Sequence, residues 1–384
     1  MVVIHWCKIA AMTGGSRRAG RRVALIAMMG LVLGAATSLA QTAQPPTGVV
    51  DTANGQSPAD PAAGPSLQLR GFGDVQFRAV DDGPAMTTFG LGQLDLFVTS
   101  ALGDSLSVLA EMVIEADDVN EVGFEIERLQ LQYFPNDHLK LIVGRFHANL
   151  GYYNTAYHHG TWFQTAVRRP MLFAFEDEGG ILPIHDVGVS ATGLMSSRRI
   201  GLHYLAEVGN GRDWTPGAEP VQNENDHTSQ KAVNVGFFAR PERWTGFQAG
   251  ASLYRDRISR DAEAAITNTI VVAHVAYQGA DVELLNEFVL LQHRVDGGAT
   301  YRSPAGYAHV SRRFGHVRPY ARYEFIDVDP ATPLIGATGR SHGPSAGVRI
   351  EPGAFAAVKV QYDRRVRKGS ETSNGLTVQL AFTF

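Results

Sequence analysis

From residue 66 to the C terminus, apolar and polar residues alternate with a period of two along most of the chain. This period places successive side chains on opposite faces of a strand, whereas an amphipathic helix repeats every 3.6 residues. Turn residues divide the region into sixteen predicted strands, at residues 66–80, 87–101, 104–116, 122–135, 138–149, 184–196, 198–209, 231–241, 244–256, 267–278, 281–294, 299–314, 316–327, 342–352, 354–364 and 374–384.

The connections between the predicted strands are alternately short and long. Tight turns such as 102–104 and 352–353 alternate with longer, more polar segments, of which residues 150–182 are the longest. Turns therefore lie at one end of the structure and loops at the other. This asymmetry is typical of a bacterial outer-membrane barrel, which has short periplasmic turns and long extracellular loops. The predicted fold class is all-β, a transmembrane antiparallel β-barrel of sixteen strands.

The two faces of single strands fit lipid on one side and water on the other. In the last strand, one face is apolar and consists of Leu376, Val378, Leu380, Phe382 and Phe384. The opposite face carries Thr377, Gln379, Ala381 and Thr383. A soluble β-sandwich would also alternate, so the alternation by itself leaves both folds open. The asymmetric connections, the aromatic C terminus and an N-terminal export signal together favour the barrel.

The export signal is the pattern of a secretory signal peptide at residues 1–40. Arginines precede an apolar run, and Ser38 and Ala40 are small residues suited to cleavage after Ala40. Cleavage removes the single cysteine, Cys7. It also removes five basic residues and no acidic ones, so the formal net charge changes from −4 to −9. An exported, acidic, cysteine-free chain argues against nucleic acid as a partner.

The rest of the chain divides into two predicted parts. Residues 41–65 are rich in Pro, Ala, Gly and small polar residues, and we expect a flexible periplasmic lead-in there. Residues 66–384 form the predicted barrel.

Two stretches of sequence resemble a known family. The ending, from Leu376 to Phe384, is similar to the C-terminal signal of outer-membrane barrels. The segment Val143-Gly-Arg-Phe-His147, followed by Asn154–Trp162, Arg169-Pro170 and Phe175–Gly180, resembles bacterial porins, most closely the phosphate-selective porins O and P. The resemblance implies a passive channel for small hydrophilic solutes or ions in the bacterial outer membrane. It also implies contact with lipid, a homotrimer and no cofactor. It does not extend to phosphate selectivity, because no ladder of lumen arginines and lysines aligns.

A sixteen-stranded barrel encloses a lumen too wide for side chains to fill. The connection 150–182 is the candidate to narrow it, because it is unusually aromatic, with Tyr152, Tyr153, Tyr157, Trp162, Phe163, Phe173 and Phe175. Exposing so many aromatic side chains to water would be costly. We expect the loop to fold into the lumen, as the third loop of porins does. The alternative is that it covers the mouth or packs on a neighbouring subunit.

Charged residues predict how the constriction works. The loop carries Arg168 and Arg169, followed by Glu176, Asp177 and Glu178. The predicted basic wall consists of Arg70, Arg78, Arg318, Arg322, Arg349 and Lys359, and the more acidic remainder includes Asp95, Glu111, Glu207, Glu283 and Glu287. Opposite charges across a narrow, low-dielectric constriction would create a transverse field. The simpler alternative is that these charges are solvated and paired. Ion selectivity stays open, because the net charge and the basic wall point in opposite directions.

Other functions are less consistent with the sequence. A barrel enzyme of the lipase or protease kind needs a nucleophile, a base and an orienting group, and no Gly-x-Ser-x-Gly occurs. A transporter of hydrophobic substrates would need a plug, for which residues 41–65 are too short and polar.

His158 and His159, or the acidic loop around Asp117, Asp118 and Glu121, could suggest a metal. Neither has the ligand spacing of a site, so solvated or packing roles are expected and no metal is predicted.

Overall fold

The structure is a computed structural model that describes residues 66–81, 86–116, 121–157, 160–175, 179–195, 199–214, 230–260 and 264–384. The predicted signal peptide and lead-in lie outside the described residues. So do Glu176, Asp177 and Glu178 of the long connection, and His158, His159, Asp117 and Asp118.

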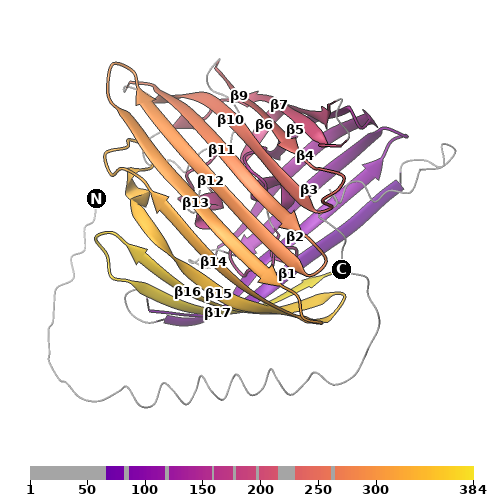
Figure 1. Ribbon diagram of the computed structural model, residues 1–384, viewed down its shortest axis with the longest axis vertical. Coiled ribbons are helices and arrows are strands. Elements are labelled where there is room, and N and C mark those ends of the chain that lie inside the picture. Colours follow the sequence, from indigo (N-terminus) through magenta and orange to yellow (C-terminus); the bar gives the residue numbers. More distant parts are fainter. Residues whose placement is uncertain are drawn as a thin grey trace, which may run out of the picture. The chain divides into compact units, whose positions relative to one another are not determined.

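Sixteen long strands form one antiparallel sheet that closes on itself, because β1 pairs with both β2 and β17 (Figure 1). The long strands are β1 (Ser66–Val80), β2 (Met86–Ala101), β3 (Leu106–Ala116), β4 (Val122–Asn136), β5 (Leu139–His147), β6 (His185–Leu194), β7 (Leu202–Asn210), β9 (Lys231–Ala239), β10 (Phe247–Arg260), β11 (Ile266–Gln278), β12 (Val282–Val295), β13 (Thr300–Arg312), β14 (Val317–Asp327), β15 (Arg340–Gly353), β16 (Ala356–Arg367) and β17 (Ser373–Thr383). This confirms the predicted sixteen-stranded barrel.

Four short elements complete the described chain. The strand β8 (Asp213–Trp214) pairs in parallel with the end of β10 and lies inside a connection that the sequence predicts as a loop. The helix α2 (Tyr153–Ala156) and the 3-10 turn η2 (Met171–Phe173) lie between β5 and β6, and η3 (Gly336–Thr338) lies between β14 and β15. No helix in the described ranges is long and apolar enough to cross a membrane.

Some strand boundaries differ from the predicted ones. The strand β7 begins at Leu202 rather than at 198, because Gly201 adopts a positive φ of 58° that ends the turn and cannot continue a strand. At the loop end, β10 runs on to Arg260 and β16 to Arg367, both beyond the predicted ends. These extensions move charged residues from predicted loops onto the wall.

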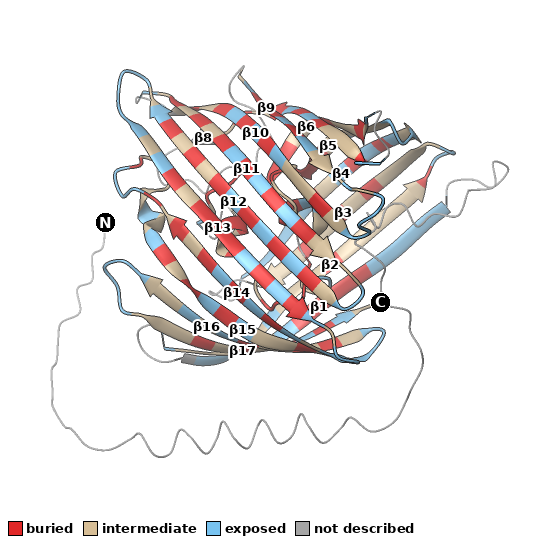
Figure 2. Cartoon of the chain, viewed as in Figure 1, coloured by how far each residue is buried: buried red, intermediate tan, exposed pale blue. Residues whose placement is uncertain are grey.

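Burial alternates along the strands, as Figure 2 shows for β11–β13. In β12, Glu283 and Glu287 are buried. Leu284, which follows Glu283, and Phe288, which follows Glu287, are exposed. In β17, Gln379 is buried and Leu380 is exposed. The polar residues therefore face the lumen and the apolar residues face outward, which confirms the predicted faces of the last strand. An apolar outer face suits lipid.

The barrel closes between its first and last strands. Phe72 of β1 is opposite Thr383 of β17, and the backbone amides of Gly71 and Phe384 each donate to the carbonyl of the other, at 3.1 and 2.9 Å. At the loop end of the same seam, the Asp81 carboxylate accepts from the backbone and side-chain amides of Asn374. These bonds hold the pKa of Asp81 below its usual value.

Candidate channel constriction

The connection between β5 and β6 spans residues 148–184, and its described residues lie inside the barrel; we call it the inner loop. Leu150, Tyr153, Leu172 and Phe173 are almost fully buried. They pack in one apolar cluster with inward-facing residues of β11–β14, which include Ile270, Val272, Leu285, Val289, Leu291, Ala305, Tyr307 and Ile326. The prediction that this segment folds into the lumen is confirmed.

The aromatic side chains of the inner loop explain why it folds inward. The ring of Tyr153 stacks on that of Phe173, with centroids 5.4 Å apart. Phe163, near the middle of the loop, remains partly exposed but contacts the ring of Phe72 on β1 at 5.5 Å. The loop therefore crosses from β12 toward the seam, because its aromatic rings are removed from water along that path.

Carboxylates on the barrel wall accept hydrogen bonds from the inner loop where it starts. Glu287 of β12 accepts from the backbone amides of Tyr152 and Tyr153, at 2.6 and 2.8 Å, and from the Tyr307 hydroxyl at 2.7 Å. These amides belong to the first turn of α2, where a helix provides no carbonyl partner. Gly151 makes the close approach possible: its φ is +81°, and a Cβ atom there would lie 2.0 Å from the Glu287 carboxylate.

Two further carboxylates act in the same way. Glu207 of β7 accepts from the backbone amide of Asn149 at 3.1 Å and also from its side chain. Glu324 of β14 accepts from the amide of Met171 at 2.7 Å, at the start of η2. Glu207 and Glu287, which are predicted lumen acids, and Glu324 thus hold the loop by its N–H groups.

Cations on β14–β16 hold the middle of the loop by its carbonyl groups. Arg349 donates to the carbonyls of Trp162 and Gln164, at 2.5 and 2.9 Å. Lys359, which is fully buried, donates to the carbonyls of Thr161 and Ala166.

Arg322 completes this set of cations. It donates to the carbonyl of Arg168 at 2.8 Å and to that of Arg169 at 3.4 Å. The sequence predicts that Arg322, Arg349 and Lys359 face the charges of the loop across a narrow constriction. The structure places all three against the loop instead, because its irregular backbone needs donors that a strand would supply.

The other predicted residues lie in varied surroundings. Arg70 is exposed on β1 beside Gln68, and half-buried Arg318 contacts Ser311. The guanidinium of Arg169 lies over the ring of Phe175, 3.6 Å from its centroid. Asp95 and Glu111 are buried on the opposite wall.

That opposite wall contains a charged cluster on β2–β6 that the sequence does not reveal. Glu111 is paired with Arg128, and Glu127 with His185. His147 lies 3.5 Å from Glu111, and its ring centroid is 5.5 Å from that of His185. A register shift beside Glu111 turns both Glu127 and Arg128 inward, and such a bulge has no signal in the sequence. No cluster of three or more potential metal ligands occurs among the described residues.

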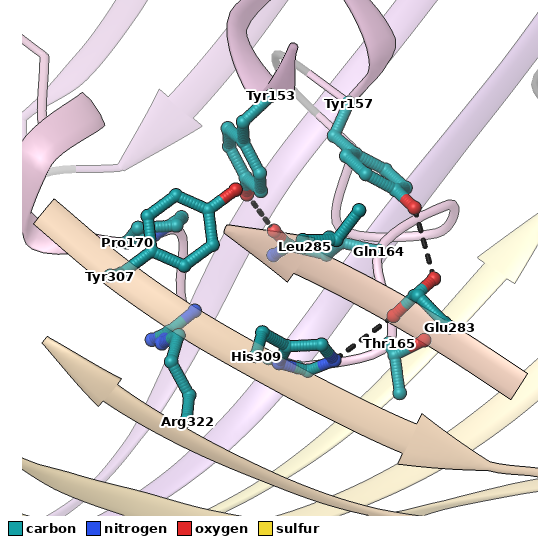
Figure 3. Close-up of a pocket in the computed structure, with 11 residues that line it drawn as sticks. Tyr153, Tyr157, Gln164, Thr165, Pro170, Glu283, Leu285, Tyr307, His309 and Arg322 are labelled. Atoms are coloured by element: carbon teal, nitrogen blue, oxygen red, sulfur yellow. Dashed lines mark hydrogen bonds and ion pairs between the residues drawn. The ribbon is translucent and has the colours of Figure 1, made fainter. Parts of the chain in front are cut away.

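The loop leaves almost no space against β12–β14. Figure 3 shows this region, where Tyr157 donates to Glu283 at 3.0 Å and Glu283 also pairs with His309. Tyr153 donates to Gln164 across the same gap. The remaining cavity is about 10 Å³, which is no larger than one water molecule. A solute larger than water therefore does not fit in this cavity.

A larger cavity of about 250 Å³ lies at the loop end of the barrel, beside β1 and β15–β17, and we call it the vestibule. Its charged lining consists of Arg78, Arg168, Arg364, Arg365, Glu324 and Asp363. The Nε atom of Arg168 lies 3.9 Å from the Asp363 carboxylate. The pKa of Arg168 is lowered, chiefly by burial. The nearby Asp363 opposes this shift, and the cations Arg78, Arg365 and Arg322 add to it. Arg168 still remains a cation at neutral pH.

Arg78 and Arg168 are among the predicted pore residues. The period of two also places Glu324 with Arg322, and Asp363 with Lys359, on the water-facing side of their strands, whereas Arg364 and Arg365 are not predicted there. Arg365 was missed because the predicted strand ended one residue before it.

Comparison with known proteins supports the fold. No family model matches the sequence, and no curated protein is similar to it. Similar solved structures include an anion-selective porin from Comamonas acidovorans, with 14% identity, a TM-score of 0.59 and coverage of 83% of this chain and 100% of that one. The outer membrane channel DcaP of Acinetobacter baumannii has 12% identity, a TM-score of 0.55 and coverage of 86% and 100%.

A trimer form of OmpT, an outer membrane protein of Vibrio cholerae, has 14% identity and a TM-score of 0.55, with coverage of 84% of this chain and 100% of that one. The chain therefore has the fold of outer-membrane porins. The similarity does not single out the porin O and P group.

Proposed function

We propose that this protein is a porin of the bacterial outer membrane, through which small hydrophilic solutes and ions diffuse passively, with a preference for anions. The vestibule is the observation that carries the proposal. Four arginines and two carboxylates line it, and only Arg168 and Asp363 are within 4 Å of each other. In a confined space, this positive surplus lowers the energy of an anion and raises that of a cation.

Several observations support the proposed location. The outer face is apolar, and exposed aromatic residues mark the turn end, namely Trp244, Phe314, Phe355 and Phe384. Aromatic girdles are typical of the lipid interface of outer-membrane barrels. The signal peptide is consistent with export, and we extend the trimeric state from the similar OmpT to a homotrimer here.

The alternative is a barrel enzyme with lipase or protease chemistry. Such an enzyme needs a nucleophile, a base and an orienting group together at the rim. The charged groups of this lumen instead hold the inner loop or line the vestibule. We therefore propose that the protein is not an enzyme. Hydrolytic activity without conductance would favour the alternative.

Reversal potentials in planar bilayers under a KCl gradient test the proposal. The wild type should give a large, steady conductance and a potential on the anion-selective side. The variant Arg78→Gln/Arg168→Gln/Arg365→Gln should shift severalfold toward cation permeability, because it removes three positive charges from the vestibule.

The control is a turn-end variant, Arg199→Gln/Arg243→Gln/Arg312→Gln, which removes three exposed arginines at the other end of the barrel. Its reversal potential should match the wild type. Absence of any conductance would contradict the channel. An unchanged potential in the vestibule variant would contradict the anion preference alone.

A further inference from the structure

The outer surface of the barrel carries a group of arginines close to its loop end. They are Arg255 and Arg257 on β10, Arg294 on β12 and Arg302 on β13, and together we call them the outer basic patch. Their neighbours along the strands, such as Asp256, His293 and Ser303, are buried in the lumen wall. The four arginines therefore point away from the lumen.

The strand register brings these residues together. Arg257, Thr267, Arg294 and Thr300 are opposite one another across β10–β13. The next row is Arg255, Thr269, Gln292 and Arg302. Adjacent strands are about 4.8 Å apart and rows about 7 Å apart, so arginines of the two rows can converge on one group. Two rows of donors cover an area that fits a phosphorylated headgroup.

Most of the positive charge in the patch is uncompensated. Arg257 pairs with Asp296 in the loop that follows β12. Arg255, Arg294 and Arg302 are exposed, and within the described ranges none of them forms a hydrogen bond or an ion pair. Three exposed guanidinium groups thus lie in two adjacent rows across β10–β13.

The patch borders directly on apolar surface. Leu253 and Val271 follow the arginine rows toward the turn end, and both are more than 40% exposed. On the opposite side of the barrel, the loop ends of β2 and β4 present Phe89, Leu91 and Phe124 outward instead of charges. Outward-facing positive charge is therefore not a general property of the rim.

We propose that the outer basic patch binds a phosphorylated lipid of the outer leaflet, with its phosphates on Arg255, Arg294 and Arg302 and its acyl chains on the apolar wall below. Arginine binds phosphate through paired N–H donors. The adjoining apolar surface selects a lipid over a soluble anion, because a soluble phosphate would gain nothing from Leu253 and Val271. The proposal rests on the outer-membrane location proposed above, but not on conduction.

Native mass spectrometry of the full-length mature protein in detergent, titrated with purified lipid A, tests this binding. The variant Arg255→Gln/Arg294→Gln/Arg302→Gln should bind lipid A roughly a hundredfold more weakly, because three cations at the interface are lost. The turn-end variant has the same change in charge and should bind as the wild type does. A triple Arg→Lys variant at the patch keeps the charge but loses the paired donors, so its affinity should lie between those of the wild type and the glutamine variant. This variant covers the case in which the glutamine variant folds poorly.

Two ligand controls separate the sources of phosphate. Dephosphorylated lipid A should bind weakly to the wild type, and millimolar inorganic phosphate should not compete with lipid A. Equal binding by the patch variant and the wild type would overturn the proposal, as would full competition by inorganic phosphate. Conductance of the patch variant, measured in parallel, should equal that of the wild type, so a failure of the channel proposal is recognised separately.

Discussion

Two regions of the lumen hold the inner loop with opposite chemistry. On β7 and β12, Glu207 and Glu287 accept hydrogen bonds from its first N–H groups. On β15 and β16, Arg349 and Lys359 donate to carbonyls in its middle. The sign of each wall charge thus follows the backbone group that faces it. A helix start exposes donors, and an irregular segment exposes acceptors.

This difference changes how the charges of the lumen should be counted. Lys359 and Arg349 are buried by the loop that they hold, so their charge is directed at carbonyl oxygens. Arg78 and Arg365 line open space in the vestibule. Buried anchors fix the shape of the channel, and vestibule charges set the potential that an entering ion meets. Formal charge in the sequence does not separate the two groups.

Removing the loop should give the largest effect. Deletion of Thr155–Glu178 takes away the middle of the inner loop, which Arg349 and Lys359 hold, together with Arg168. Single-channel conductance should rise severalfold and anion preference should fall, because the lumen of a sixteen-stranded barrel is otherwise wide. A conductance equal to that of the wild type would show that the inner loop does not restrict flow.

Weakening the basic wall should give the second largest effect. In Arg349→Met/Lys359→Met, four carbonyl contacts are lost, and the free energy of unfolding should decrease by about 2–4 kcal/mol. The freed segment should also make the channel current noisy. Denaturant unfolding and single-channel recording measure the two effects. The matched control is Arg318→Met, since Arg318 lies on the same wall but contacts only Ser311 among the described residues. Equal effects from both variants would refute the anchoring role.

Weakening the acidic wall should have the smallest effect. Glu287→Gln keeps one acceptor oxygen for the two amides of Tyr152 and Tyr153. The free energy of unfolding should therefore decrease by about 1–2 kcal/mol. Conductance should stay near that of the wild type, because the apolar cluster still packs this part of the loop. Glu242→Gln, at an exposed turn, provides the control. A decrease in the free energy of unfolding larger than that of the basic-wall variant would contradict the expected order of the two effects.

Sequence alone predicts the local parts of this structure well. The strands and their faces follow from a period of two, and the inward fold of the loop follows from its aromatic residues. Contacts between residues that are far apart in the sequence cannot be predicted in this way. Trp162 and Arg349 are 187 positions apart, and no local pattern encodes the level at which the two meet in the lumen.

The misplaced charges have the same physical origin. Arg257 and Arg365 were predicted in loops, yet they lie on β10 and β16, because strand pairing continues past the last alternating apolar residue. Glu127 and Arg128 face inward together through a register shift. Pairing with a neighbouring strand determines where a strand ends and which way its side chains face. The sequence of a single strand does not contain this information.

The seam between β1 and β17 sets the order in which this protein can be assembled. Phe72 and Thr383 are paired although they lie at opposite ends of the barrel sequence. Until the final strand is made, β1 has one open row of N–H and C=O groups, which lipid cannot satisfy. The unfinished sheet must therefore be kept from bare lipid until its last residues arrive. Closure of the barrel in the membrane therefore depends on the last strand of the chain.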